Sequence, residues 1–289
     1  MDLYNETKLI MRKYGINANK SLGQNFLINE DVVNKIVDSA LISKEDLVIE
    51  IGPGLGTLTN ELLKRAGKVI CIELDERMLR ILNEIFKENE NLELIHEDVL
   101  KVDLKSLIEK EKASGTIKKV KIVANLPYYI TTPIIMKLLE EKLEIESITV
   151  MIQKEVAERL TEKPGGKNTG AITYTIAYYT DASKIIDVPN SSFIPEPEVT
   201  SSVIKLKILK EPRIKPLDEK LFFKTVKIAF MQKRKTLLNS LTNGKLLESK
   251  VETEQMLNDL NLDLRVRPEN LTIEQYEAIA NYIKINKDK

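Results

Sequence analysis

Apolar strand-like runs alternate regularly with longer helical stretches between residues 47 and 153. The runs are LVIEI, KVICIEL, LELIH, KIVANL and SITVMI, and stretches such as DERMLRILNEIF and TPIIMKLLEE separate them. This alternation predicts a mainly parallel sheet covered by helices, because parallel strands need long crossover connections. Ligands of such folds bind at the carboxyl ends of the strands. The residues that follow each run are therefore the candidates for a functional site.

The rest of the chain changes character twice. After a glycine-rich stretch around EKPGGKNTG, further strand candidates follow, of which KIIDV and SSVIKLKIL are the clearest. From residue 217 onward the pattern is helical, in DEKLFFKTVKIAFMQ, ETEQMLNDL and TIEQYEAIANYIK. We therefore predict an amino-terminal arm with a first helix over residues 1–45, an α/β domain over 46–208, and a small all-helical domain over 209–289.

Single copies of cysteine and histidine exclude several kinds of chemistry. Cys71 has no partner for an internal disulfide, and its apolar run predicts a buried side chain. His96 alone cannot build a two-histidine metal site, so we expect no metal and interpret it as a strand-end residue.

The least charged window, residues 122–136, is too short and too interrupted to span a bilayer. With no secretory signal in MDLYNETK, we expect a cytoplasmic protein without membrane contact.

The first apolar run leads into a glycine loop, EIGPGLGTLT, at residues 50–59. Its closely spaced glycines, Gly52 and Gly54 among them, leave the backbone bare enough for a ligand to lie against it. The dinucleotide fingerprint would require a further glycine where the chain has Thr57, so a pyrophosphate is not required. A tight structural turn is the alternative explanation for this loop.

Carboxylates follow the second and third runs. Glu73 lies near the end of the second run, 21 residues after Gly52 (73 − 52), where an acidic side chain can accept both hydroxyls of a ribose. Asp98 lies just past the third run, where it can receive the amino group of an adenine. A bare loop, a carboxylate for a ribose and a carboxylate for a base describe an adenosine cofactor that needs no phosphate. We therefore predict S-adenosyl-L-methionine as the cofactor.

The fourth run ends in VANLPYYITTP, which places an amide, a proline and two aromatic rings together. Pro127 forces Leu126 into an extended conformation, so the Leu126 carbonyl can point outward beside the side-chain carbonyl of Asn125. Two such acceptors would favour the pyramidal, nucleophilic form of an adenine amine, and Tyr128 supplies a ring for stacking. We predict a catalytic site here. An ordinary strand end followed by a proline-initiated loop is the alternative.

Positive charge is concentrated in one part of the chain. The net charge is zero, but the segment from Lys205 to Lys250 holds 13 basic against 4 acidic residues, a local excess of +9. Such an excess suits a polyanion, and a solvated helical face explains it equally well. Within the segment, Lys233, Arg234 and Lys235 form the densest cluster and are the predicted phosphate contacts.

Eight segments, in order along the chain, resemble the ribosomal RNA adenine dimethyltransferases of the KsgA type. They are KSLGQNFL (20–27), the glycine loop, IELD (72–75), EDVL (97–100), NLPYYITTPI (125–134), QKEVAERL (153–160), FIPEPEVTSSV (193–203) and FMQKRKTLLNSL (230–241). The resemblance implies a Rossmann-like class I methyltransferase domain. It also implies a set of cofactor contacts, with two from the arm: Asn25, Leu27, Gly52, Glu73, Asp98 and Asn125.

The resemblance further implies a reaction and a partner. Methyl groups would pass from S-adenosyl-L-methionine to two adjacent adenines near the 3′ end of 16S ribosomal RNA, within an immature 30S subunit, and the enzyme would act as a monomer. Prolines at 195 and 197 would stiffen a loop in which Phe193 stacks on a flipped base, with packing at the domain boundary as an equal alternative. One departure is Thr200, where the family usually has aspartate, so no role is carried over to that position.

Three other functions stay open at this point. A resistance-type methyltransferase acting on large-subunit RNA would share the architecture, since target choice resides in surfaces that a sequence describes poorly. A non-catalytic factor for small-subunit assembly would have no reason to keep the glycine loop and Asn-Leu-Pro-Tyr intact. A nicotinamide dehydrogenase is disfavoured by Thr57 and by the lack of an acid or base for hydride transfer.

Overall fold

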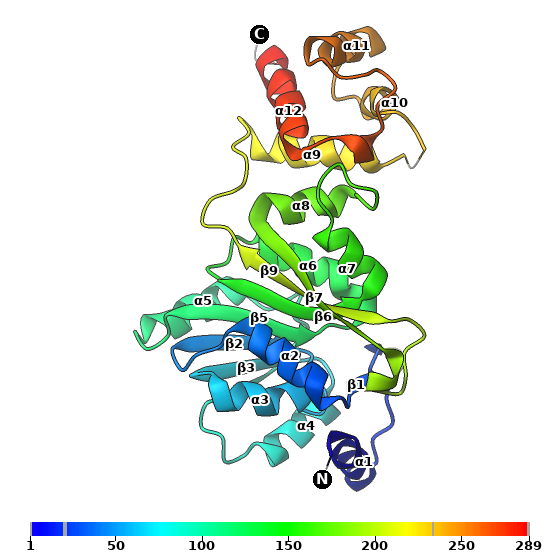
Figure 1. The fold of residues 1–289 in the computed structure, drawn as a ribbon. Helices are drawn as coiled ribbons and strands as arrows, with labels where there is room; N and C mark the ends of the chain where they lie inside the picture. Colours follow the sequence, from blue (N-terminus) through cyan, green and yellow to red (C-terminus); the bar gives the residue numbers. More distant parts are fainter. Residues whose placement is uncertain (1, 20–21, 233, 288–289) are drawn as a thin grey trace. The chain divides into compact units, whose positions relative to one another are not determined.

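The computed structural model describes residues 2–19, 22–232 and 234–287 (Figure 1). It contains a seven-stranded sheet with the strand order β4-β3-β2-β5-β6-β9-β7. The strands are β2 Asp46–Ile51, β3 Lys68–Glu73, β4 Leu92–His96, β5 Lys119–Asn125, β6 Ser147–Gln153, β7 Thr180–Val188 and β9 Ser201–Ile208. All the strands that the sequence predicts between residues 47 and 153 are therefore present.

The sheet is parallel from β4 to β6, and β9 joins β6 in the antiparallel direction. The strand β2 is buried along its whole length, as is usual for a parallel strand that helices cover on both faces. Its register places Glu50 beside Cys71 of β3 and beside Val123 of β5. The carboxyl ends of these strands consequently lie at one edge of the sheet. The predicted, mainly parallel α/β fold is confirmed.

Helices connect these strands. They are α2 Glu30–Ala40, α3 Thr57–Arg65, α4 Glu76–Ile85, α5 Leu104–Ala113, α6 Thr131–Glu140 and α7 Lys154–Thr161. The helix α2 packs against β5 and β6, and α3 packs against β3, so both lie across the front of the sheet in Figure 1. Asn29 caps α2 and Asp75 caps α4, because each side chain accepts a hydrogen bond from a backbone N–H of the first turn.

The amino-terminal arm joins the sheet domain through a second, two-stranded sheet. The arm begins with α1 Leu3–Lys13 and reaches the short strand β1 Phe26–Leu27. This strand pairs antiparallel with β8 Phe193–Ile194, and the register sets Leu27 opposite Phe193. Residues 26–27 are thus held by a segment more than 160 positions away in the sequence.

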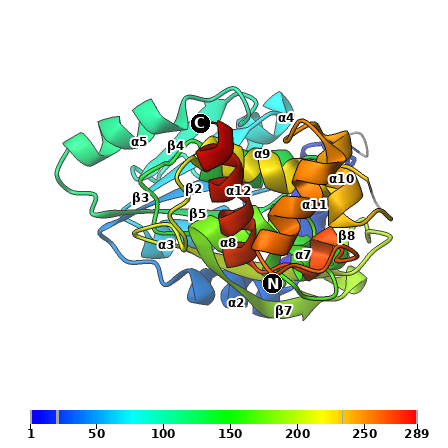
Figure 2. The same cartoon turned by 90° about the horizontal axis from the view of Figure 1, so that it is seen from above.

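The described chain divides into two compact units, one made of residues up to 157 with 183–208, and one made of 158–182 with residues from 209 onward. The second unit is helical and contains α8 Ala171–Tyr179, α9 Glu219–Phe230, α10 Leu237–Asn243, α11 Lys250–Asp259 and α12 Ile273–Lys287. Within it, α12 packs against α9 and α11 (Figure 2). The helices predicted after residue 217 are present, and the domain boundaries at 46 and 209 stay predictions.

The core of the second unit is rich in aromatic side chains. Tyr174 of α8 and Tyr276 of α12 are buried and meet edge to face, with ring centroids 4.6 Å apart. The Tyr174 hydroxyl donates a hydrogen bond of 2.6 Å to the Leu271 carbonyl, so its polar atom is satisfied.

None of the helices within the described ranges is long and apolar enough to cross a bilayer.

Candidate active site

A cavity with about 1000 Å³ of empty space, counted to its open mouth, lies at the carboxyl ends of β2, β3 and β5. Its walls come from residues 22–27 of the arm, 50–55 and 57–58 around the glycine loop, 72–74, 97–99 and 125–130. The structure therefore brings together the predicted cofactor contacts and the predicted catalytic residues of the strand end. They are Asn25, Leu27, Gly52, Gly54, Glu73, Asp98, Asn125, Leu126, Pro127 and Tyr128. Their individual roles stay predictions.

The glycine loop approaches the arm closely. Gly52 and Gly54 have φ angles of 68° and 58°, in the left-handed region that favours glycine. A β-carbon on Gly54 would lie 3.4 Å from the ring of Phe26 in β1. A side chain at this position would contact the arm, and its main cost would be the left-handed backbone conformation.

Glu73 is fixed through both of its carboxylate oxygens. Oε2 accepts a hydrogen bond of 3.2 Å from the Gly54 N–H, and Oε1 accepts one of 2.8 Å from the Asp75 N–H. Burial raises the pKa of Glu73, and the backbone hydrogen bonds oppose that rise. A carboxylate offers about four lone-pair positions, so these bonds leave capacity to accept a hydroxyl group of a ligand.

Asp98 approaches the same cavity from the segment after β4. Its Oδ1 accepts a hydrogen bond of 3.0 Å from the Leu100 N–H, which fixes the carboxylate while its second oxygen can bind a ligand. Leu74 and Val99 follow the two carboxylates in sequence and also line the cavity, Leu74 with 47% of its surface exposed. Leu74 and Val99 were not predicted as cavity residues. Their positions directly after Glu73 and Asp98 were the signal that could have identified them.

The side chain of Asn125 is oriented by the arm. Asn125 is the last residue of β5, and its Nδ2 donates a hydrogen bond of 3.2 Å to the Asn25 carbonyl. An amide has one donor end and one acceptor end, so this bond leaves Oδ1 available as an acceptor. The adjacent Leu126 N–H donates to the Met151 carbonyl at 3.1 Å, which fixes the peptide unit that follows.

Tyr128 is anchored by a residue that the sequence did not identify. Its hydroxyl lies 2.5 Å from the Ser201 hydroxyl at the start of β9. Burial raises the pKa of Tyr128, so the phenol is neutral at physiological pH. Ser201 lies directly after Thr200, the position where the chain departs from the family pattern, and that departure was the available signal.

Phe193 is not one of the described residues that line this cavity. Its side chain is only 1% exposed and belongs to the hydrophobic core beside Leu27. The strand pairing explains this position, since β8 holds Phe193 opposite the arm. The predicted stacking on a base would require the ring to leave the core, and this role stays a prediction.

Comparisons with known proteins place this geometry in a family. Residues 15–284 match the family model described as ribosomal RNA adenine dimethylase. The chain belongs to this family. It is 48% identical over 276 residues to the ribosomal RNA small subunit methyltransferase A of Alkaliphilus oremlandii, a match that covers 96% of this chain and 95% of the relative. The resemblance inferred from the eight motifs is confirmed.

Solved structures agree with this membership of the adenine dimethylase family. A dimethyladenosine transferase from Plasmodium falciparum superposes with a TM-score of 0.75 at 28% identity, over 91% of this chain and 98% of that one. The 23S rRNA methyltransferase ErmE superposes with a TM-score of 0.68 at 23% identity, over 90% of this chain and all of that one, which shows a shared fold. The predicted methyltransferase class is thereby confirmed.

Glu50 is a buried acid beneath the cavity of this family member. It is 1% exposed, and its Oε2 accepts hydrogen bonds from the Thr59 hydroxyl at 2.6 Å and from the Cys71 thiol at 3.4 Å. Burial raises the pKa of Glu50 to about 7. Cys71 is buried, as predicted, and burial raises its pKa too. In the sequence, Glu50 stands out only as the first residue of the glycine loop.

The helical unit carries exposed positive charge. Arg234 and Lys235 are exposed in the loop between α9 and α10, whereas Lys233 lies outside the described residues. Three further exposed lysines follow one face of α9 at helical spacing: Lys220, Lys224 and Lys227. The described basic residues of this unit therefore include a helix face that the sequence analysis did not predict.

We expect Ser201→Ala to lower kcat/KM for methyl transfer to ribosomal RNA by about fivefold, because the Tyr128 ring loses one neutral hydrogen bond that fixes it. Steady-state kinetics on unmethylated ribosomal subunits measure the effect. The matched control is Ser202→Ala, which also removes one serine hydroxyl bond, the one from Ser202 to Asp187 at 2.7 Å, but does not affect Tyr128. Equal activity of wild type and Ser201→Ala would rule out this positioning of Tyr128.

Glu50 should make stability depend on pH. Its pKa is about 7 in the folded protein and 4.5 as the ordinary value, so between these pH values only the folded state holds the proton. The free energy of unfolding of the wild type, minus that of Glu50→Gln, should therefore fall by about 3 kcal/mol as the pH rises from 4.5 to 7. Urea unfolding of both proteins across this range measures the difference, and parallel pH profiles would contradict the assignment.

Proposed function

We propose that this protein uses S-adenosyl-L-methionine to dimethylate the exocyclic amines of two adjacent adenines near the 3′ end of 16S ribosomal RNA, within an immature 30S subunit. The observation that carries the proposal is the Asn125 amide, whose nitrogen donates to the arm and which lies at the wall of a cavity lined by Glu73 and Asp98. The choice of RNA is supported by the relative named as a small subunit methyltransferase.

The residues that line the cavity fit this cofactor. Glu73 would accept the ribose hydroxyls on its free lone pairs, and Asp98 would accept the adenine amino group. Gly52 and Gly54 expose bare backbone, and Asn25 of the arm borders the opposite wall. When bound, the cofactor supplies a methyl group activated by a sulfonium centre.

The chain's own residues would make the adenine amine reactive. The nitrogen lone pair of adenine is delocalised into the ring, and acceptors on its two protons favour the pyramidal form. Asn125 Oδ1 and the Leu126 carbonyl would be these acceptors, and Tyr128 would stack on the base. The nitrogen becomes positive in the transition state, so the fixed carbonyl dipoles stabilise that state more than the bound base. No strong general base is needed, because the alkylated ammonium loses its proton to water.

The helical part of the chain, residues 209–289, is proposed to bind the RNA. Exposed cations release counterions when they contact phosphates, and Arg234, Lys235 and the lysines of α9 are exposed. Lys233, outside the described residues, is included in this proposal on its sequence alone. We further propose that the protein acts as a monomer in the cytoplasm.

Asn125→Ala should reduce methyl transfer by about 100-fold or more, because one of the acceptors for the amine is lost. Binding of S-adenosyl-L-methionine, measured by calorimetry, should persist, since Glu73 and Asp98 are unchanged. Transfer of labelled methyl groups to small subunits lacking the modification provides the activity, and mapping the labelled base tests the RNA target. Asn60→Ala, on the exposed face of α3, is the control. Full activity of Asn125→Ala would refute the proposed chemistry.

Replacing Lys233, Arg234 and Lys235 with glutamine should weaken RNA binding and flatten its salt dependence. Each phosphate contact contributes roughly 0.7 to 0.9 to the slope of log affinity against log salt, so the slope should fall by about 2. Binding titrations at several salt concentrations measure it. A triple variant at Lys87, Lys105 and Lys110, which are exposed in the first unit, removes the same charge elsewhere. Equal slopes in the two triple variants would remove the cluster from the interface.

A further inference from the structure

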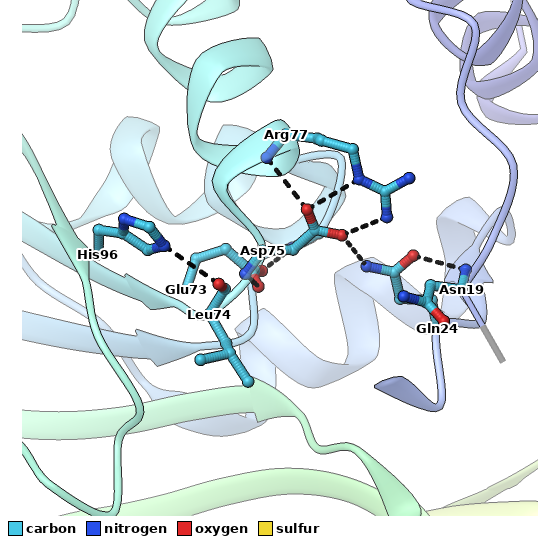
Figure 3. Close-up of polar contacts among 8 residues, drawn as sticks. Asn19, Gln24, Glu73, Leu74, Asp75, Arg77 and His96 are labelled. Carbon is cyan, nitrogen blue, oxygen red and sulfur yellow. Dashed lines mark hydrogen bonds and ion pairs between the residues drawn. The ribbon is translucent and has the colours of Figure 1, made fainter. Parts of the chain in front are cut away.

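The side chain of Gln24 bridges the arm to the loop between β3 and α4 (Figure 3). Its Oε1 accepts a hydrogen bond of 2.8 Å from the Asn19 N–H, and its Nε2 donates one of 2.9 Å to Oδ2 of Asp75. Gln24 therefore uses both ends of its amide within the protein. Such a fully bonded side chain is suited to fix the backbone that carries it.

The partner of Gln24 is itself rigidly held. The Asp75 side chain is buried and receives hydrogen bonds from Arg77, from the backbone N–H at 3.0 Å and from the guanidinium at 3.0 and 2.6 Å. Arg77 lowers the pKa of Asp75, so the carboxylate is charged at neutral pH. The Asp75 N–H in turn donates to Oε1 of Glu73 at 2.8 Å. Gln24 is thus connected through one residue to the carboxylate proposed to hold the ribose.

The residue after Gln24 contacts the other side of the cavity. The Asn25 carbonyl accepts the hydrogen bond from Asn125 Nδ2 at 3.2 Å. If this carbonyl moved away, the Asn125 amide would lose the contact that distinguishes its nitrogen from its oxygen. Two consecutive arm residues therefore link the proposed ribose carboxylate to the proposed catalytic amide.

The rest of the arm is held without Gln24. Residues 26–27 pair with β8, and the Thr57 hydroxyl donates to the Leu27 carbonyl at 3.3 Å. Loss of the Gln24 bridge should therefore shift residues 24 and 25 while the strand beside them stays in place. This separates an effect on the cavity from an effect on folding.

We infer that Gln24 is a positioning residue, whose bond to Asp75 sets both cofactor affinity and the orientation of the Asn125 amide. The inference rests on the proposed use of S-adenosyl-L-methionine. It predicts that the two effects change together, because one displacement of the arm alters both walls of the cavity.

Gln24→Glu places a carboxylate against the charged Asp75 and is the decisive variant. We expect about tenfold weaker binding of S-adenosyl-L-methionine by calorimetry and about fivefold lower kcat at saturating cofactor, because a hydrogen bond to a charged group becomes a repulsion. The Asp75 oxygen that binds Gln24 also accepts from the Arg77 guanidinium, so Asp75→Asn alone is the reference for the double variant. Because the repelling carboxylate is absent in Asp75→Asn, adding Gln24→Glu to that variant should change both quantities by less than about threefold.

Gln24→Met, which keeps the side-chain length but removes the amide that bonds Asn19 and Asp75, should change both quantities in the same direction by about threefold. The matched control is Gln255→Glu in α11, where Gln255 donates to Asp259 at 2.7 Å in the other unit, and cofactor affinity should be unchanged there. Thermal unfolding midpoints of all variants check that each protein is folded.

Cofactor affinity and kcat within twofold of wild type in Gln24→Glu would overturn the inference. So would an effect of Gln24→Glu that is as large on the Asp75→Asn background as on the wild type, because the effect would then not pass through Asp75. If the wild-type protein does not bind S-adenosyl-L-methionine, the proposed cofactor is wrong and the inference fails with it. If the wild type binds the cofactor and the Gln24 variants bind it with the same affinity, only the inference is wrong.

Discussion

The hydrogen bond from Asn125 Nδ2 to the Asn25 carbonyl joins the sheet to the arm across 100 positions of sequence. The strand β5 can place an amide at the edge of the sheet, but a side-chain amide can rotate. One end of the amide donates hydrogen bonds and the other end accepts them. Because the arm accepts a hydrogen bond from the Asn125 nitrogen, the Asn125 side-chain oxygen is left to bind a ligand. The proposed chemistry on an amine depends on that polarity, because a second donor at this place would repel the protons of the base.

The features that could be predicted from sequence are those encoded locally or by the topology of a parallel sheet. Strands β2, β3, β5 and β6 are largely continuous apolar runs, because the sheet buries them on both faces, whereas the edge strand β4 is only partly buried. Once these strands are parallel, the residues after them must converge. Glu73, Asp98 and Asn125 could therefore be assigned to one cavity before any coordinates were known.

The features that could not be predicted depend on pairings between distant segments. A two-residue strand such as β8 carries no periodicity, so the prolines near Phe193 predicted only a stiffened loop, with base stacking and packing as equal alternatives. The pairing with β1 places the Phe193 ring in the core. The bonds of Ser201 to Tyr128 and of Gln24 to Asp75 are invisible for the same reason. Thr57, interpreted only as a residue that excludes a pyrophosphate, also donates a hydrogen bond to the arm.

The ladder between β1 and β8 has a consequence for the synthesis of the molecule. Leu27 and Phe193 are 166 residues apart (193 − 27), so the arm leaves the ribosome long before the strand it pairs with. At about 5 to 20 residues per second, that interval lasts roughly 8 to 30 seconds. During this time the central strands can already assemble, while the wall formed by residues 22–27 lacks one of its supports. The arm side of this cavity can consequently reach its final support only after residues 193–194 have been made, when β2 to β6 have already left the ribosome.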